Sequence, residues 1–206
     1  MGGYFSKTIA AVLLWFALCT SAFAQVTPIP DNTTFRSAIT SCLAETGAGV
    51  TGECTNFGTS SGYGTMPNWD TSLVTDMSGA FLYQTLFNGE IGNWNTSNVI
   101  NMFQTFHSAY AFNKDIGSWD VTSVTRMDGM FQFASNFNQD ISSWDMSNVF
   151  FASNMFEYAI VFNQDISGLL TKDTERFRTS MTNLSAVNCI KIIKKAASLF
   201  VDAAAA

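Results

Sequence analysis

Large apolar residues recur along the middle of the chain at a constant step of 25 residues, with polar residues at fixed places between them. We call a set of equivalent positions, 25 residues apart, a column. The columns with aromatic side chains are Trp69, Trp94, Trp119 and Trp144; then Phe81, Phe106, Phe131 and Phe156; then Phe87, Phe112, Phe137 and Phe162. A fixed period of this length predicts a solenoid, because each repeat is one coil that cannot bury its apolar side alone. We therefore expect a four-coil repeat solenoid over residues 66–168, with these columns as its shared core.

Within one repeat, the pattern changes from strand-like to helix-like and then to a turn. Residues 122–127 are rich in β-branched side chains and predict a brief strand. Residues 130–134 contain good helix formers and no Gly or Pro, which predicts one helical turn or a short 3₁₀ piece. Residues 137–141 combine Asn and Asp with two apolar residues and predict a turn. The predicted fold class is α/β, a leucine-rich-repeat-like solenoid with helical N- and C-terminal caps.

The segment before the repeats, residues 25–65, is expected to cover the open end of the first coil. Residues 31–46 predict a helix that begins at Asp31 or Asn32 and ends at Gly47. Cys42 and Cys54 are expected to form a disulfide, with two free buried thiols as the alternative.

The segment after the repeats, residues 169–206, is interpreted as a degenerate fifth coil followed by a helix. From Ser185 the apolar residues are spaced as on one helical face. This helix is expected to cap the solenoid, and a helix lying on a membrane surface is the alternative. Cys189 has no evident partner and is either buried or links two chains.

Residues 1–24 have the pattern of a secretory signal peptide. Lys7 precedes an apolar run, and Ala22-Phe-Ala24 fits the cleavage rule, so the mature chain is expected to begin at Gln25 without a stable membrane span. Two alternatives are a myristoylation site at Gly2 and a lipoprotein acceptor at Cys19.

The repeat unit has the pattern W-[DN]-x-[ST]-x-V-x-x-M-x-x-x-F-x-x-x-x-x-F-N-x-[DE]-I. This pattern resembles the BspA-like surface-protein repeat, a relative of the leucine-rich repeat. The resemblance covers residues 66–168, about half of the chain, and residues 35–44 also look like the lead-in of such proteins. It implies a secreted or surface-attached solenoid that is often linked to adhesion. It supplies no catalytic residues.

Charge narrows the classes of partner. The formal net charge is −6, and residues 25–168 hold three basic residues against 13 acidic ones. An acidic chain of this kind is unsuited to the phosphate backbone of a nucleic acid.

Candidate chemistry is sparse, and no cofactor or metal is expected. Two acidic columns, one from Asp70 to Asp145 and one from Glu90 to Asp165, suit either turn capping or Ca²⁺, and turn capping is the favoured interpretation. A hydrolase that uses these carboxylates is a further alternative. The G-x-G-x-x-G motif at residues 47–52 lacks the strand that a dinucleotide site needs, and the sole histidine, His107, is expected to be a surface residue.

The sequence favours a non-enzymatic secreted or cell-surface protein that binds an extracellular protein or glycan, with adhesion as its role. A further column of the repeat holds valine, at Val74, Val99, Val124 and Val149. Candidate contact residues flank this valine column at Ile100, Thr125 and Phe150. The alternative for Phe150 is that it packs inward together with Phe151. Three possible glycosylation sites are Asn32, Asn95 and Asn183.

Overall fold

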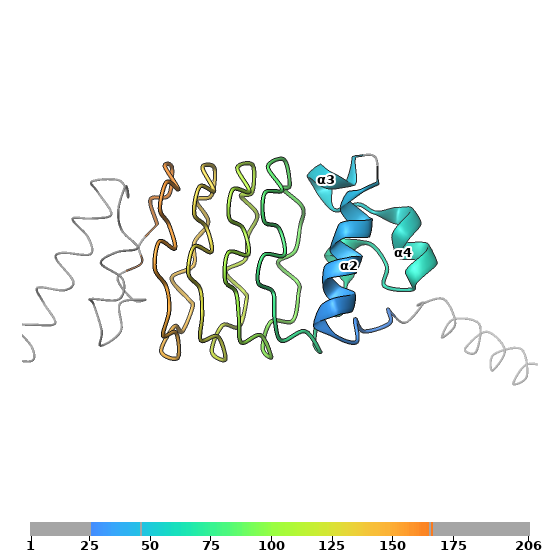
Figure 1. The fold of residues 1–206 in the computed structure, drawn as a ribbon, viewed down its shortest axis with the longest axis horizontal. Helices are drawn as coiled ribbons and strands as arrows, with labels where there is room; N and C mark the ends of the chain where they lie inside the picture. Colours follow the sequence, from blue (N-terminus) through green and yellow to red (C-terminus); the bar gives the residue numbers. More distant parts are fainter. Residues whose placement is uncertain (1–25, 46, 165, 167–206) are drawn as a thin grey trace, which may run out of the picture.

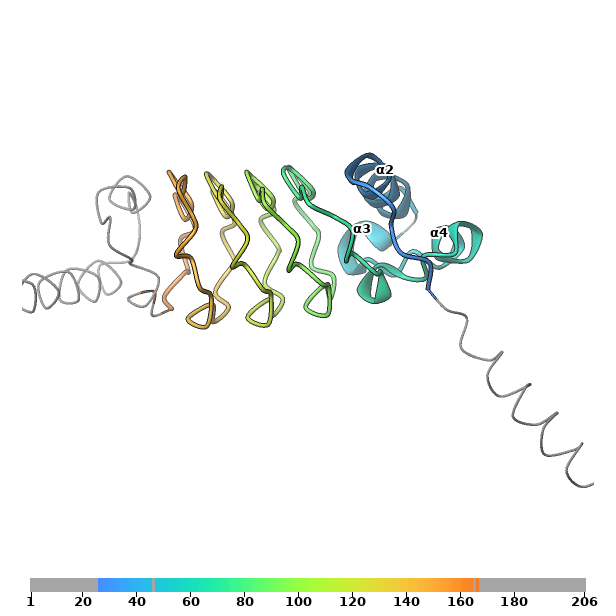
Figure 2. The same cartoon turned by 90° about the horizontal axis from the view of Figure 1, so that it is seen from below.

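The computed structural model describes residues 26–45, 47–164 and 166, which form a helical N-terminal part followed by a row of stacked coils (Figure 1). The N-terminal part contains α2 (Asn32–Leu43), α3 (Ala48–Thr51), α4 (Thr55–Ser61) and the 3₁₀ helix η1 (Met66–Asn68). From Trp69 the chain makes four coils that follow one another along the long axis of the molecule, as the second view also shows (Figure 2).

Several predicted segments lie outside the described residues. These are the signal peptide of residues 1–24, the degenerate coil and helix of residues 169–206, and with them Asn183 and Cys189. Among the helices that the structure describes, none is long and apolar enough to cross a membrane.

The predicted α/β, leucine-rich-repeat-like fold class is wrong. In the described part of the chain, all helices precede Trp69, and no sheet forms. The strand expected in each coil is reduced to one residue in an isolated parallel bridge: Asp76 with Asn101, Asn101 with Arg126, and Arg126 with Phe151. The helical turn expected at residues 130–134 is also absent, and turns take its place.

The backbone conformation explains why neither a strand nor a helix forms. In the first coil, the N–H groups of Met77, Gly79, Phe81 and Tyr83 donate to carbonyls of the second coil at 2.8–2.9 Å. The N–H groups of Ala80, Leu82 and Gln84, which alternate with the last three of these along the chain, instead donate to carbonyls three residues back. Backbone N–H groups in this segment therefore alternate between closing a turn within the coil and bonding the next coil.

Two positions in each coil adopt the left-handed conformation that this series of turns requires. The first left-handed position is Gly79, Gln104, Gly129 and Asn154, and the second is Tyr83, Ser108, Phe133 and Tyr158, all with φ between 52° and 63°. Neither a strand nor a right-handed helix can continue through a positive φ. These residues end the elements that the side-chain pattern predicts.

The tryptophan column forms the centre of the coil stack. Each of the four indoles is 3% exposed, and the rings of Trp69, Trp94 and Trp119 stack in parallel at centroid distances of 6.0 and 6.4 Å. The indole Nε1 of Trp119 donates to the carbonyl of Ile91 at 3.0 Å, and Trp144 makes the same bond to Ile116 at 3.1 Å. The large apolar ring is thus buried with its one polar group satisfied.

The two phenylalanine columns close each coil. Their rings stack across the coil at 3.9–4.3 Å, in the pairs Phe81–Phe87, Phe106–Phe112, Phe131–Phe137 and Phe156–Phe162. The five residues between the two rings form a loop. Its middle residue is buried in three coils, as Ala109, Ala134 and Ala159, while most of its other residues are at least partly exposed. We call these segments the tip loops: residues 82–86, 107–111, 132–136 and 157–161.

The asparagine that follows the second phenylalanine column joins successive coils. The Oδ1 atom of Asn88 accepts the N–H of Asn113, Asn113 accepts that of Asn138, and Asn138 accepts that of Asn163, at 2.8–2.9 Å. This asparagine ladder satisfies backbone groups that turns would otherwise leave unpaired.

Helix α2 covers the first coil. Asp31 caps the helix by accepting the N–H of Thr34 at 2.7 Å. The Oδ1 atom of Asn32 accepts the N–H groups of Thr75 and Asp76, and Arg36 forms an ion pair with Asp76 at 3.1 Å. These side chains occupy the place that a preceding coil would take.

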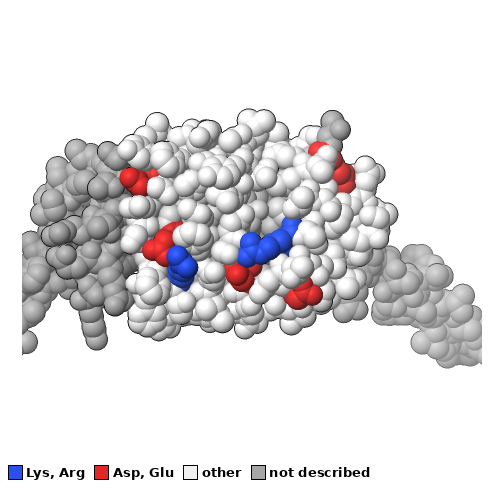
Figure 3. Space-filling view, viewed as in Figure 1, with Lys and Arg blue, Asp and Glu red and all other residues white. Residues whose placement is uncertain are grey.

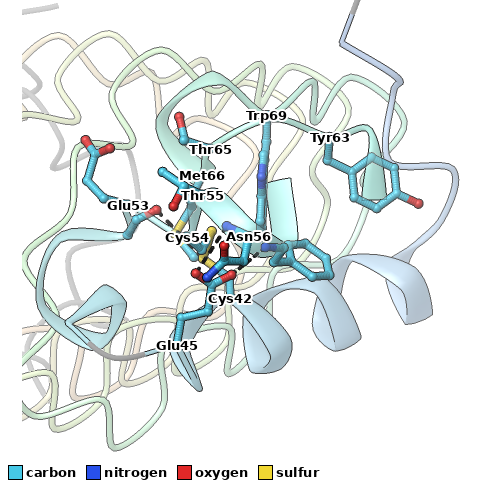
Figure 4. Close-up of a disulfide and its surroundings, with 12 residues drawn as sticks. Cys42, Glu45, Glu53, Cys54, Thr55, Asn56, Tyr63, Thr65, Met66 and Trp69 are labelled. Carbon is cyan, nitrogen blue, oxygen red and sulfur yellow. Dashed lines mark hydrogen bonds between the residues drawn. A yellow bond between two sulfur atoms is a disulfide. The ribbon is translucent and has the colours of Figure 1, made fainter. Parts of the chain in front are cut away.

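A disulfide holds this cap together. Cys42 in α2 is bonded to Cys54, which directly precedes α4 (Figure 4). The carboxylate of Glu45 accepts the N–H groups of Asn56 and Phe57 at the start of α4. The loop between the two helices is thus tied at the disulfide and beside it.

Candidate binding surface

The acidic column at Asp70 caps turns. The Oδ1 atoms of Asp70, Asp120 and Asp145 each accept the N–H two residues ahead at 3.0 Å, and Asn95 does the same at 3.1 Å. A hydroxyl group and an N–H of Thr122 hold the pKa of Asp120 below its ordinary value, and Ser147 has the same effect on Asp145. The carboxyl groups of Asp120 and Asp145 are therefore ionised at neutral pH and engaged with the backbone.

Two members of the second acidic column also cap turns, and its last member, Asp165, lies outside the described residues. Asp115 and Asp140 accept the N–H groups of Gly117 and Ser142 at 2.9 Å. Glu90 is paired with Lys114 at 2.5 Å. Nowhere in residues 26–45, 47–164 or 166 do three His, Cys, Asp or Glu side chains come close enough together to hold a metal ion.

Every basic side chain in the described part is ion-paired. Arg36 bonds Asp76 at 3.1 Å, Lys114 bonds Glu90 at 2.5 Å, and Arg126 bonds Asp128 at 2.8 Å. On the face drawn in Figure 3, the basic groups lie beside acidic ones and most of the surface is uncharged. The surface therefore offers an anionic ligand no unpaired lysine or arginine among these residues.

The contact residues predicted from the sequence lie next to one another. The N–H groups of Thr125 and Phe150 donate to the carbonyls of Ile100 and Thr125, which places this column on adjacent coils. Ile100 is 50% exposed and Phe150 is 52% exposed, while Thr125 is half-buried. Phe151 is exposed as well, so neither Phe150 nor Phe151 packs inward. We call the exposed apolar residues here the valine-side band: Leu73, Ile100, Phe150 and Phe151.

A second band of exposed apolar residues lies on the tip loops, and sequence reasoning missed it. We call it the tip band: Tyr83, Leu86, Tyr110, Tyr158, Ile160 and Val161. A signal was present, because aromatic residues stand at 83, 133 and 158, which are multiples of 25 apart. Since the column contains Ser108, it did not stand out beside the unbroken Trp and Phe columns.

Four rings join the tip loops into a continuous ridge. The centroid distance is 5.5 Å from Tyr83 to His107, 5.6 Å from His107 to Phe133 and 4.7 Å from Phe133 to Tyr158. His107 is half-buried, and desolvation lowers its pKa below the ordinary value. At neutral pH this imidazole is therefore an uncharged ring, which is how it contributes to the ridge.

The possible glycosylation sites differ in their surroundings. The side-chain amide of Asn32 is bonded to the first coil through both its nitrogen and its oxygen. Asn95 is exposed, and its oxygen accepts bonds from Ser97. The G-x-G-x-x-G segment of residues 47–52 contains α3 and follows α2, so the strand that a dinucleotide site requires does not precede it.

Comparison with known proteins places the repeats in one family. No curated protein and no solved structure matches the chain. The resemblance to BspA-like repeats therefore stays a prediction. A family model described as a Mycoplasma protein of unknown function, DUF285, matches residues 53–169 and again residues 102–195. Because the first of these matches alone covers more than half of the sequence, the chain belongs to the DUF285 family.

Proposed function

We propose that this protein is a non-enzymatic binding protein, secreted or held at the cell surface, whose coils present side chains to an extracellular protein or glycan in adhesion. One observation carries the proposal. Of the eleven large apolar side chains exposed in the described part, all except Val50 belong to the valine-side band or the tip band. Clustered exposure of this kind is typical of interaction sites, whereas exposed apolar residues without a binding role are usually scattered.

The rigidity of the coils supports a binding role. Successive coils are joined by backbone hydrogen bonds, by the asparagine ladder and by stacked rings. A surface that is already ordered loses little conformational entropy when a partner binds. Repeat proteins use extended surfaces of stacked units for binding in the same way.

The carboxylates favour this function over acid–base catalysis. A general acid at neutral pH needs a raised pKa, and the pKa values of Asp120 and Asp145 are lowered. Their turn-capping bonds recur from coil to coil rather than converging on one cleft. We therefore do not propose the carboxylate-dependent hydrolase as a second function.

The proposal is tested by applying purified protein, residues 25–206, to arrays of extracellular-matrix proteins, secreted proteins and glycans. We expect saturable binding to at least one member. Heat-denatured protein with its Cys42–Cys54 disulfide reduced and alkylated serves as the unfolded control, because nonspecific adhesion would survive the loss of structure. The absence of saturable binding on every array, or equal binding by the control, contradicts the proposed function.

A further inference from the structure

We infer that the tip band, rather than the valine-side band, is the docking site, and that its partner is a protein whose apolar patch has a basic rim. This inference rests on the proposed function and gives it a location and a partner class. The tip band is carried by all the tip loops except that of residues 132–136, which contributes the half-buried ring of Phe133. It therefore extends along one edge of the whole coil stack.

Backbone strain distinguishes the tip band from ordinary surface. At the first left-handed position three of the four residues are Gly79, Gly129 and Asn154, the residue types that tolerate a positive φ. At the second left-handed position the chain instead has Tyr83, Phe133 and Tyr158, with φ of 59–61°. A bulky residue is unfavourable in this conformation, and glycine or asparagine would relieve the strain.

Two of the three strained aromatic side chains gain little burial in return, while Phe133 is half-buried. Tyr83 is 66% exposed and Tyr158 is 43% exposed. Residues held in unfavourable backbone conformations occur preferentially at binding and active sites. The aromatic side chains at these positions are therefore best explained by a contact with a partner.

The tip loops hold these side chains in a fixed arrangement. The N–H groups of Tyr83 and Phe133 donate to the carbonyls of His107 and Glu157 in the next coil. Between neighbouring tip loops, the N–H of Ala111 donates to the carbonyl of Thr85 and that of Asn136 donates to the carbonyl of Tyr110, both at 3.1 Å. A band fixed by backbone bonds is prepared for binding before the partner arrives.

The composition of the tip band favours a protein over a glycan. Three members are tyrosines, which are enriched at protein interfaces, and three are aliphatic: Leu86, Ile160 and Val161. The rings of Phe133 and Tyr158 stack on each other with an interplanar angle of 7°, so those faces are not open to a sugar ring. The amide of Gln132 donates to Glu157, and this bond occupies polar groups that a glycan hydroxyl would need.

The acidic net charge of this protein favours a partner with basic residues around its apolar patch. Residues 25–168 have a net charge of −10 from three basic and 13 acidic residues, and each of the three basic side chains is already ion-paired. Repulsion opposes an anionic membrane or a sulfated glycan, whereas lysine and arginine around the partner's apolar patch complement this field.

The experiment compares two double variants on three sets of probes: the protein arrays, the glycan array, and vesicles of phosphatidylcholine with and without phosphatidylserine. The tip variant is Tyr83→Asn with Tyr158→Asn, since asparagine suits the left-handed conformation. The control variant is Ile100→Thr with Phe150→Thr, because threonine occupies the same column at Thr75 and Thr125. A second tip variant, Leu86→Ser with Ile160→Ser, leaves the left-handed positions unchanged.

We expect a protein ligand whose Kd rises at least tenfold in both tip variants and less than twofold in the control. No variant should melt at a lower temperature than the parent protein, and relief of backbone strain should leave the asparagine variant at least as stable. Its affinity should fall as salt increases, because a basic rim meets an acidic surface. Loss of binding only in the control variant overturns the inference while the proposed function stands. Binding to a glycan or to vesicles instead of a protein also overturns it. No saturable binding to any probe contradicts the proposed function itself.

Discussion

At the scale of single residues, the aspartates of this protein act on the backbone. The carboxylate of Asp120 accepts the N–H of Thr122 at 3.0 Å and its hydroxyl at 2.6 Å, which closes a turn at the start of the third coil. Such local bonds are the reason that Asp and Asn are frequent in turns. The same geometry recurs at Asp145 with Ser147.

This contact predicts a titration effect. The hydroxyl of Thr122 is the largest cause of the lowered pKa of Asp120, so Thr122→Val should raise that pKa toward the ordinary value of 3.8. Because the folded pKa lies below the unfolded one, the bond stabilises the fold above the unfolded pKa and this stabilisation is lost as pH falls through the folded pKa. Carboxyl-carbon NMR measures the titration directly. Asp31, whose pKa is lowered by the backbone N–H of Thr34 in the cap, is the internal control, and an unchanged Asp120 in the variant contradicts the assignment.

The two described glycosylation sites should behave differently. If the chain is expressed through a eukaryotic secretory route, we expect glycan on Asn95, which is exposed, and none on Asn32. The amide nitrogen of Asn32 donates to Thr75 at 3.0 Å, and a glycan there would displace the cap from the first coil. Peptide mass spectrometry measures both sites, and a folded protein with glycan on Asn32 would contradict the described cap.

At the scale of elements, spacing revealed the core but could not reveal the backbone conformation. The Trp and Phe columns were visible because burial requires large apolar side chains at equivalent points of every coil. The left-handed residues were hidden, because Gln104, Phe133 and Tyr83 are not types that indicate a positive φ. The strand and helical turn were predicted from side-chain propensity, and backbone turns overrode that propensity.

The helix of the cap was easier to predict from the sequence than the backbone conformation of the coils. Asp31 is a strong N-cap residue, and the apolar residues that follow are spaced for one helical face, as α2 shows. The tip band could not be predicted from the sequence in this way. Its members share an edge only because Phe81 and Phe87 meet across the coil and close the residues between them into a loop.

The asparagine ladder should be worth a measurable part of the stability of the coil stack. Asn113→Ala removes the acceptor of the N–H of Asn138 and of the Gln139 amide, both at 2.9 Å. Leaving such a half-buried donor unpaired costs about 1–3 kcal/mol of unfolding free energy. Urea denaturation measures the loss. Asn136→Ala, an exposed asparagine on a tip loop, is the matched control and should change stability by less than about 0.5 kcal/mol.

At the scale of the whole molecule, the described residues form a row of turn-rich coils that follows a helical N-terminal cap. Stacked aromatic columns hold the coils together. Each coil contains 25 residues, which is the step at which the columns repeat in the sequence. The exposed bands follow from the stack, because equivalent residues of successive coils come to lie side by side. Both the proposed function and the docking site therefore depend on the tryptophan column being interior.

Thermal and urea unfolding of Trp119→Ala tests this dependence most directly. Trp119 is 3% exposed and lies in the third of the four described coils, so its removal leaves a large cavity. It also removes the indole bond to the Ile91 carbonyl, which keeps only the backbone N–H of Trp94. We predict a loss of about 3–5 kcal/mol in unfolding free energy, a large fraction of the stability of a typical domain. Trp69→Ala should cost a similar amount, because the cap packs Phe57 against that ring at 6.1 Å. An unchanged unfolding midpoint for Trp119→Ala would contradict the interior column and, with it, the stacked-coil arrangement on which both exposed bands depend.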